Sequence, residues 1–252
     1  MNFEARSVGR ARIREDQRIV LDHVRLRNED FTSRKLVQFA AIGSRLVSCR
    51  FDGSRIEYAS FGSGLEGSEY ADCVFDRCRI RFGPGGLARF VGCSFRDVEL
   101  RDWFCFTVEL IDCTFTGRLR GAIFNGTVPE EKRALLGRER NEFRGNDFSQ
   151  MDLVDVAFRT GIDLTRQRLP QDPRYVYLPD AVVALQQARA ACVGWDELEL
   201  RRSAMALLRN LEYEIEGGQR QLLLRRDDYS SLNQTATERA FALLRNQLHP
   251  PS

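Results

Sequence analysis

The sequence predicts a mainly β fold, a β-helix with four short sides per coil, followed by a small C-terminal α-helical domain. Three observations lead to this prediction: an apolar residue at every fifth position over about two thirds of the chain, four similar segments that contain Cys-x-Phe, and loss of the period after Leu169. The 252 residues are 43% hydrophobic, which is enough for a continuous core.

The five-residue period begins at Leu21, resumes at Tyr70 after a four-residue insertion, and includes Gly85 as its exception. A period of five fits neither an α-helix nor a flat strand, so it indicates a chain that turns a corner every five residues and points one side chain inward on each side. The inward positions are Leu21, Leu26, Phe31, Leu36, Ala41, Leu46, Phe51, Ile56, Phe61, Tyr70, Phe75, Ile80, Gly85, Phe90, Phe95, Leu100, Cys105, Leu110, Phe115, Leu119, Phe124, Phe143, Phe148, Leu153, Phe158, Leu164 and Leu169.

A second period supports a square coil. Four segments resemble one another, and the last three lie 20 residues apart: Val47–Phe51, Ala71–Phe75, Val91–Phe95 and Ile111–Phe115. Twenty residues are four units of five, so the Phe residues should stack on one another in successive coils about 4.8 Å apart. The cysteines of these segments should form a second column of small buried side chains.

These positions resemble the pentapeptide-repeat family, whose pattern is a central Leu or Phe with a small residue two positions earlier. The earlier position here holds Val24, Cys49, Ser54, Ala59, Ser68, Cys73, Cys78, Ala88, Cys93, Val98, Val108, Cys113 and Val156. The resemblance covers roughly residues 20–169 and implies a right-handed quadrilateral β-helix, a pentapeptide-repeat solenoid. The family's Asn, Asp and Ala flanks are sparse, and bulky Trp103 and Met151 occupy positions expected to be small.

We expect the β-helix over residues 1–169, with loop insertions at 62–69 and 127–141, a proline-marked linker at 170–179, and a helical domain at 180–252. In the second insertion, Thr127 and Glu130 form a capping box, and Gly137 suits the end of a short helix. In pentapeptide proteins that protect bacterial topoisomerases, such loops contact the enzyme. The candidate interaction loop therefore comprises Glu130, Glu131, Lys132, Arg133, Arg138 and Arg140.

Three helices are expected in the C-terminal domain: 180–192 opened by Asp180, 196–216, and 235–248 opened by a Thr235/Glu238 capping box. The segment Leu222–Leu224 fits either a helix or a strand. The second helix carries one apolar stripe of Leu200, Ala204, Leu207, Leu208, Leu211 and Ile215. This stripe suits either a cap on the open end of the β-helix or a homodimer interface, and both alternatives bury the same residues.

No motif predicts catalysis, a cofactor or a metal site. The seven cysteines lack CxxC and zinc-finger spacing, and His23 and His249 lie in no nucleophile arrangement. Nucleotide-binding and hydrolase motifs are absent from the sequence, so we expect a non-enzymatic protein. Without a secretory leader or a span of about 20 apolar residues, we expect cytoplasmic localisation with free thiols and no membrane partner. The scarcity of lysine suits a GC-rich bacterial genome.

One side of the coil predicts a basic stripe. The outward residues beside Leu36, Ile56, Ile80, Leu100 and Leu119 include seven cations and two carboxylates, Glu57 and Glu99. The cations are Lys35, Arg55, Arg79, Arg81, Arg101, Arg118 and Arg120. Two interpretations stay open, an anionic partner or an ordinary solvated face whose arginines pack their stems. No aromatic residues are evident beside the stripe, which argues against binding of single-stranded nucleic acid.

The leading functional hypothesis is a non-catalytic protein-interaction scaffold. A second is protection of DNA gyrase, a topoisomerase, since some pentapeptide proteins imitate duplex DNA and confer resistance to quinolones. That imitation needs an acidic surface, whereas residues 20–170 are close to neutral and the stripe is basic. A third hypothesis is that the basic stripe binds nucleic acid or an acidic protein.

Overall fold

The computed structural model describes residues 10–14, 17–83 and 86–246, and the chain divides into two compact units. The coil unit runs to Val156 and includes Thr165–Pro170. The helical unit consists of Ala157–Leu164 and the chain from Gln171 onwards. The predicted fold class is confirmed, because the chain is mainly β, with a solenoid of about five turns followed by helices.

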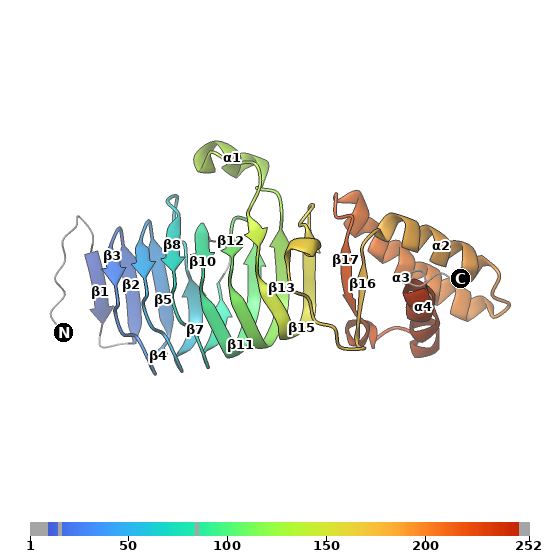
Figure 1. The fold of residues 1–252 in the computed structure, drawn as a ribbon, viewed down its shortest axis with the longest axis horizontal. Coiled ribbons are helices and arrows are strands. Elements are labelled where there is room, and N and C mark those ends of the chain that lie inside the picture. Colours follow the sequence, from blue (N-terminus) through green and yellow to red (C-terminus); the bar gives the residue numbers. More distant parts are fainter. Residues whose placement is uncertain (1–9, 15–16, 84–85, 247–252) are drawn as a thin grey trace. The chain divides into compact units, whose positions relative to one another are not determined.

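The coil unit is built from two ladders of strands, which Figure 1 shows stacked one beside the next. The first sheet contains β1 (Arg10–Arg14), β2 (Arg18–Asp22), β4 (Lys35–Leu36), β5 (Gln38–Ile42), β7 (Arg55–Ser60), β9 (Arg79–Phe82), β11 (Ser94–Cys105), β13 (Thr114–Asn125) and β15 (Asp147–Arg159). The second sheet contains β3 (Arg25–Arg27), β6 (Arg45–Val47), β8 (Ser68–Ala71), β10 (Ala88–Val91), β12 (Glu109–Ile111) and β14 (Phe143–Arg144). The registers described for these strands are parallel, except that β1 pairs antiparallel with β2.

Residues with a left-handed backbone conformation, that is, a positive φ, lie at many of the corners of the coil. They occur two positions after an inward residue, and in the first coils they form two runs with a five-residue spacing, which are ten residues apart at Ser33 and Gly43. The early members are His23, Asn28, Ser33, Gly43, Ser48 and Gly53. Later corners hold Asp72, Asp97, Asp102 and Asp112, residue types that tolerate positive φ better than β-branched residues do. The predicted turn every five residues is therefore built into the backbone.

The inward Phe side chains form a continuous stack along the coil. Ring centroids lie 4.8 Å apart for Phe51 and Phe75, 4.7 Å for Phe75 and Phe95, and 4.9 Å for Phe95 and Phe115. The rings are nearly parallel, and the spacing equals that of hydrogen-bonded strands. Leu26 and Leu169 are half-buried, unlike the other inward positions that the structure describes, and Gly85 lies outside the described residues.

Bulky residues at expected small positions are compensated by small neighbours. Trp103 is buried and stacks on Phe82 with centroids 4.2 Å apart. The strands on either side contribute Ala59, which pairs with Phe82, and Ala122, which pairs with Trp103. The two large stacked side chains are therefore flanked on either side by a small one, which leaves room for both rings in the core.

The two insertions differ from prediction in detail. Gly62 is buried and Ser68 begins β8, so the first loop covers 63–67 and is shorter than the predicted 62–69. The second contains α1 (Glu130–Leu136), which stands off from the stacked strands in Figure 1. The capping box predicted there is wrong, since Pro129 occupies the N-cap and no side chain caps the helix. Gly137 ends α1 with a φ of 61°.

The helical unit contains a small antiparallel pair, β16 (Tyr175–Leu178) with β17 (Leu222–Arg225), and three helices, α2 (Ala181–Val193), α3 (Leu198–Glu216) and α4 (Gln234–Asn246). Two short 3-10 segments, η1 (Leu164–Arg166) and η2 (Arg226–Tyr229), complete the described elements. The region predicted as a linker thus includes a strand, because Tyr175, Val176 and Leu178 are buried.

Helix caps agree with the sequence at one of two positions. Asp180 accepts a hydrogen bond from the Val183 N–H, as expected. The Thr235/Glu238 capping box is wrong, since α4 already begins at Gln234. The side chain of Asn233 accepts from the Ala236 N–H instead, at 3.0 Å.

The apolar stripe of α3 is buried within its own unit. Ala204, Leu207, Leu208 and Leu211 pack into a core that also contains residues of α2, α4, β16 and β17. In this fold the stripe is therefore already covered, and dimerisation would need another face of these helices. No helix among the described residues is long and apolar enough to cross a membrane.

The Phe stack predicts a large loss of stability on truncation. Phe95→Ala removes a fully buried ring from the middle of the stack, so we expect a loss of about 3–5 kcal/mol. Leu65→Ala, at an exposed loop position, should change stability by less than about 0.5 kcal/mol. Urea unfolding followed by circular dichroism measures both, and equal midpoints would contradict the stacked core.

The loop at 63–67 carries a pH-sensitive contact. His23 Nδ1 lies 2.5 Å from Asp22 Oδ1, and its Nε2 lies 3.0 Å from Glu66 Oε2. The hydrogen bond with Asp22, helped by the charge of Glu66, raises the pKa of His23 above its usual value of 6.5. The contact is therefore fully present below about pH 6.5 and is lost as pH rises through the raised pKa.

An NMR titration of the His23 ring tests this contact. Asp22→Asn should lower the pKa of His23 more than Glu66→Gln does, because the Asp22 hydrogen bond is the largest cause. A wild-type pKa at or below 6.5 would show that the imidazole is not held by these carboxylates.

Candidate functional site

The predicted basic stripe forms in register on the first sheet. Lys35 pairs with Arg55, and Arg55 with Arg79, as direct cross-strand neighbours. Arg81 pairs with Arg101, and Arg101 with Arg120, in a second row of the same sheet. All of these side chains are exposed. Each row therefore places three cations opposite one another at the strand spacing of about 4.8 Å.

Three arginines of the stripe have carboxylate partners. Arg79 Nε lies 3.4 Å from Glu99 Oε2, Arg81 Nε lies 2.8 Å from Asp102 Oδ2, and Arg118 Nε lies 2.9 Å from Asp152 Oδ2. The four other cations make no ion pair with the residues that the structure describes: Lys35, Arg55, Arg101 and Arg120. Like charges directly opposite one another repel. For these four cations, no carboxylate partner among the described residues offsets that repulsion.

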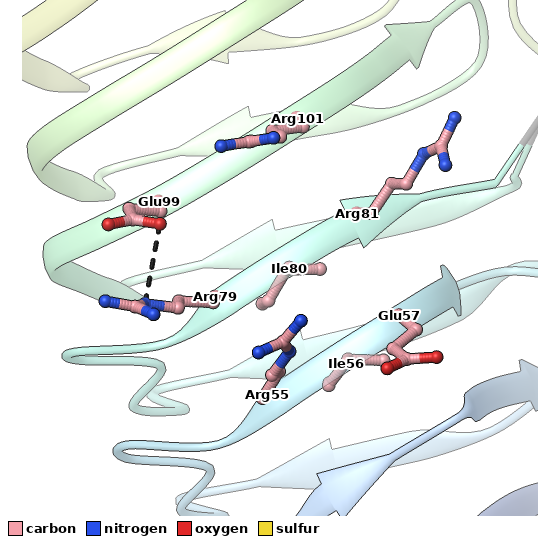
Figure 2. Close-up of a pocket in the computed structure, with 8 residues that line it drawn as sticks. All are labelled: Arg55, Ile56, Glu57, Arg79, Ile80, Arg81, Glu99 and Arg101. Carbon is pink, nitrogen blue, oxygen red and sulfur yellow. Dashed lines mark ion pairs between the residues drawn. The ribbon is translucent and has the colours of Figure 1, made fainter.

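Two shallow, solvent-open hollows of about 410 Å³ each lie along this stripe. Figure 2 shows the first, where Arg55, Arg79, Arg81 and Arg101 surround the strand positions of Ile56 and Ile80. The dashed line in Figure 2 joins Arg79 and Glu99. The second hollow shares Glu99 and Arg101 with the first and adds Arg118 and Arg120. The stripe is thus a grooved surface lined by projecting guanidinium groups together with carboxylates.

The second sheet has a different charge pattern. Arg45 lies 3.2 Å from Glu69, and Arg89 lies 3.1 Å from Glu109. Arg144 contacts both Glu142 and Asp112. On that sheet Arg25 faces Arg45 at the first step, and carboxylates face arginines at the steps that follow. Rows of three successive cations occur on the first sheet.

Two aromatic rings beside the stripe were missed in the sequence. Tyr58 follows Arg55 by three positions on β7, and Phe104 follows Arg101 by three positions on β11. Both rings are exposed, at 43% and 37%. The expectation that no aromatic residues lie beside the stripe is therefore wrong. The sequence feature that could have revealed them is that each of these aromatic residues follows an arginine of the stripe by three positions.

The candidate loop divides into anchoring and exposed residues. Arg138 turns toward the coil, where it forms an ion pair with Glu109 and donates to the Thr107 carbonyl at 3.0 Å. Asn141 also anchors the loop, since its amide donates to the carbonyls of Phe106 and Asn125. Glu130, Glu131, Arg133 and Arg140 are exposed, and Lys132 is half-buried. Within the loop, Arg133 donates to the Val128 carbonyl at 3.1 Å and Arg140 pairs with Thr127, whereas Arg138 connects the loop to the coil.

The cysteines are buried, and the thiols of the six in the coil donate to backbone carbonyls. Cys73 donates to Leu46, Cys93 to Tyr70 and Cys113 to Phe90, each in the preceding coil. Burial raises the pKa of Cys78 to about 12 and also raises the pKa of Cys93. No group of three or more His, Cys, Asp or Glu side chains in the described part of the chain is arranged to hold a metal ion.

No family model matches this chain, and no curated protein matches it. Among solved structures, a trypsin-treated variant of QnrB1, a plasmid-mediated fluoroquinolone resistance protein, is similar at 14% sequence identity. The match covers 58% of this chain and 89% of that chain, with a TM-score of 0.18. A likeness at this TM-score carries no argument about function.

The anchoring role of Arg138 has a measurable consequence. Glu109 is 5% exposed, so Arg138→Ala removes one of the cations that balance a buried carboxylate. We expect a loss of about 1–3 kcal/mol in the free energy of unfolding. Lys132→Ala, on the same loop, should change it by less than about 0.5 kcal/mol. If both variants unfold at the same urea concentration, Arg138 does not anchor the loop.

Proposed function

We propose that this protein is a non-catalytic interaction scaffold of the pentapeptide-repeat type that binds an anionic partner through the basic stripe of its first sheet. The observation that carries the proposal is the pair of in-register rows, Lys35–Arg55–Arg79 and Arg81–Arg101–Arg120. A bound anion would relieve the repulsion within each row, so partner binding and the stability of the stripe are coupled.

The rigidity of the coil supports this role. The stripe residues sit on strands whose inward neighbours, Ile56, Ile80 and Leu100, are 1–2% exposed. Since these strands are hydrogen-bonded from coil to coil, the cations are presented at fixed spacing along the sheet. A preorganised row of charges loses less entropy on binding than flexible side chains on a mobile loop do.

Imitation of DNA at a gyrase is not the function that the geometry favours. Such imitation needs carboxylates in excess along the surface, whereas acids of the coil are balanced by arginines. Asp52 contacts Arg50 and Arg77, and Asp147 contacts Arg168. Protection of a gyrase is tested separately by DNA supercoiling with ciprofloxacin, with and without this protein; no protection at stoichiometric protein would discard that hypothesis.

The stripe is tested by charge reversal and heparin chromatography. The triple variant Arg55→Glu, Arg101→Glu and Arg120→Glu removes three of the unpaired cations. We expect the wild-type protein to bind the column and the variant to elute at a clearly lower salt concentration, because fewer counterions are released on binding.

A control of equal charge separates the stripe from net charge. Arg25→Glu, Arg27→Glu and Arg45→Glu place the same change on the exposed side of the second sheet. The control should elute close to the wild type. Equal elution of the two triple variants would mean that net charge, and not the stripe, determines retention, and the proposal would fail.

A further inference from the structure

We infer that the basic stripe binds single-stranded nucleic acid, with phosphates on the arginines and bases stacked on Tyr58 and Phe104. This inference rests on the proposed function and names its partner. An acidic protein face could neutralise the arginines equally well, but it would leave the two exposed rings without a role.

Each ring follows an arginine of the stripe by three positions, and the two rings flank one column of inward residues, since Ala59 pairs with Phe82 and Trp103 stacks on Phe82. Glu57 and Tyr58 are consecutive exposed residues of β7, and the chain turns at Asp102, which has a φ of 61°. Phe104 therefore lies just past the corner from Arg101. A strand that follows the stripe with its phosphates can fold its bases over this edge.

Gly83 supports the ring of Tyr58. A Cβ added at Gly83 would lie 2.5 Å from Cζ and 2.7 Å from Oη of Tyr58, so the ring occupies the space that a side chain would take. The ring rests against the backbone on that side, and 43% of the residue remains exposed to solvent. This is the arrangement of a platform with one supported and one open side.

The cations run diagonally across the sheet. The first row supplies Lys35, Arg55 and Arg79, and the second supplies Arg81, Arg101 and Arg120, with the two rows meeting at β9. The diagonal crosses five strands, so it extends over roughly 19 Å, or four steps of about 4.8 Å. Glu99 lies directly opposite Arg79 and pairs with it, so the cations continue from there in the second row. The track therefore suits a linear polyanion.

Fluorescence anisotropy with a labelled 12-nucleotide oligothymidylate tests the inference on the full-length protein. If each of the four unpaired cations contacts one phosphate, the plot of log K against log salt should have a slope of about −3. The oligothymidylate should bind more tightly than a duplex of the same length and than poly-glutamate, because only unstacked bases can reach the rings.

The double variant Tyr58→Ala and Phe104→Ala should weaken oligothymidylate binding about tenfold or more and leave heparin elution unchanged. Tyr213→Ala, an exposed tyrosine of the helical unit, is the matched control and should bind like the wild type. Circular dichroism confirms that each variant is folded.

The outcomes separate this inference from the proposed function. If the aromatic variant binds oligothymidylate as the wild type does, or if the duplex or poly-glutamate binds at least as tightly, the single-strand inference is overturned while the basic stripe stands. If the triple charge variant and its control elute together from heparin, the proposed function itself is lost.

Discussion

The in-register stacking of successive coils is the constraint on which the rest of this structure depends. Because every coil pairs its backbone with the next, an outward residue is held over its counterpart as firmly as an inward one. The same register that brings Phe75, Phe95 and Phe115 into one stack brings Arg55 opposite Arg79. Core and surface are therefore set by one period, and surface charges form rows.

Rows of charge have consequences that scattered charges lack. Where opposite charges meet, as at Arg89 and Glu109, each coil compensates the next and the face needs nothing from outside. Where like charges meet, as at Arg81, Arg101 and Arg120, repulsion recurs at both steps of the row. A fold that tolerates such rows holds them in place through its buried residues. Under the proposed function, an anion bound at the stripe would contribute the free energy that relieves this repulsion.

The fold and the stripe could both be predicted from the five-residue period. The period identifies which side chains point inward, and because successive coils stack in register, it also identifies which outward side chains lie opposite one another. The features that could not be predicted depend on contacts between residues far apart in the sequence, which a local period does not encode. β16 pairs with β17 across a stretch of helices, and Arg138 reaches Glu109 only once the loop has folded back. Tyr58 was overlooked because its exposure depends on the corner and on the space left at Gly83.

The packing of the coil interior and of the helical unit limits which residues of this protein can contact a partner. Side chains inside the coil are closely packed aromatic, aliphatic and thiol groups, and the apolar stripe of α3 is covered by helices of its own unit. These two sets of buried apolar residues are therefore not available to contact another molecule. The described surface presents the basic stripe of the first sheet, together with the exposed rings of Tyr58 and Phe104. Recognition by this protein is therefore expected to begin with charge and to gain its selectivity from stacking.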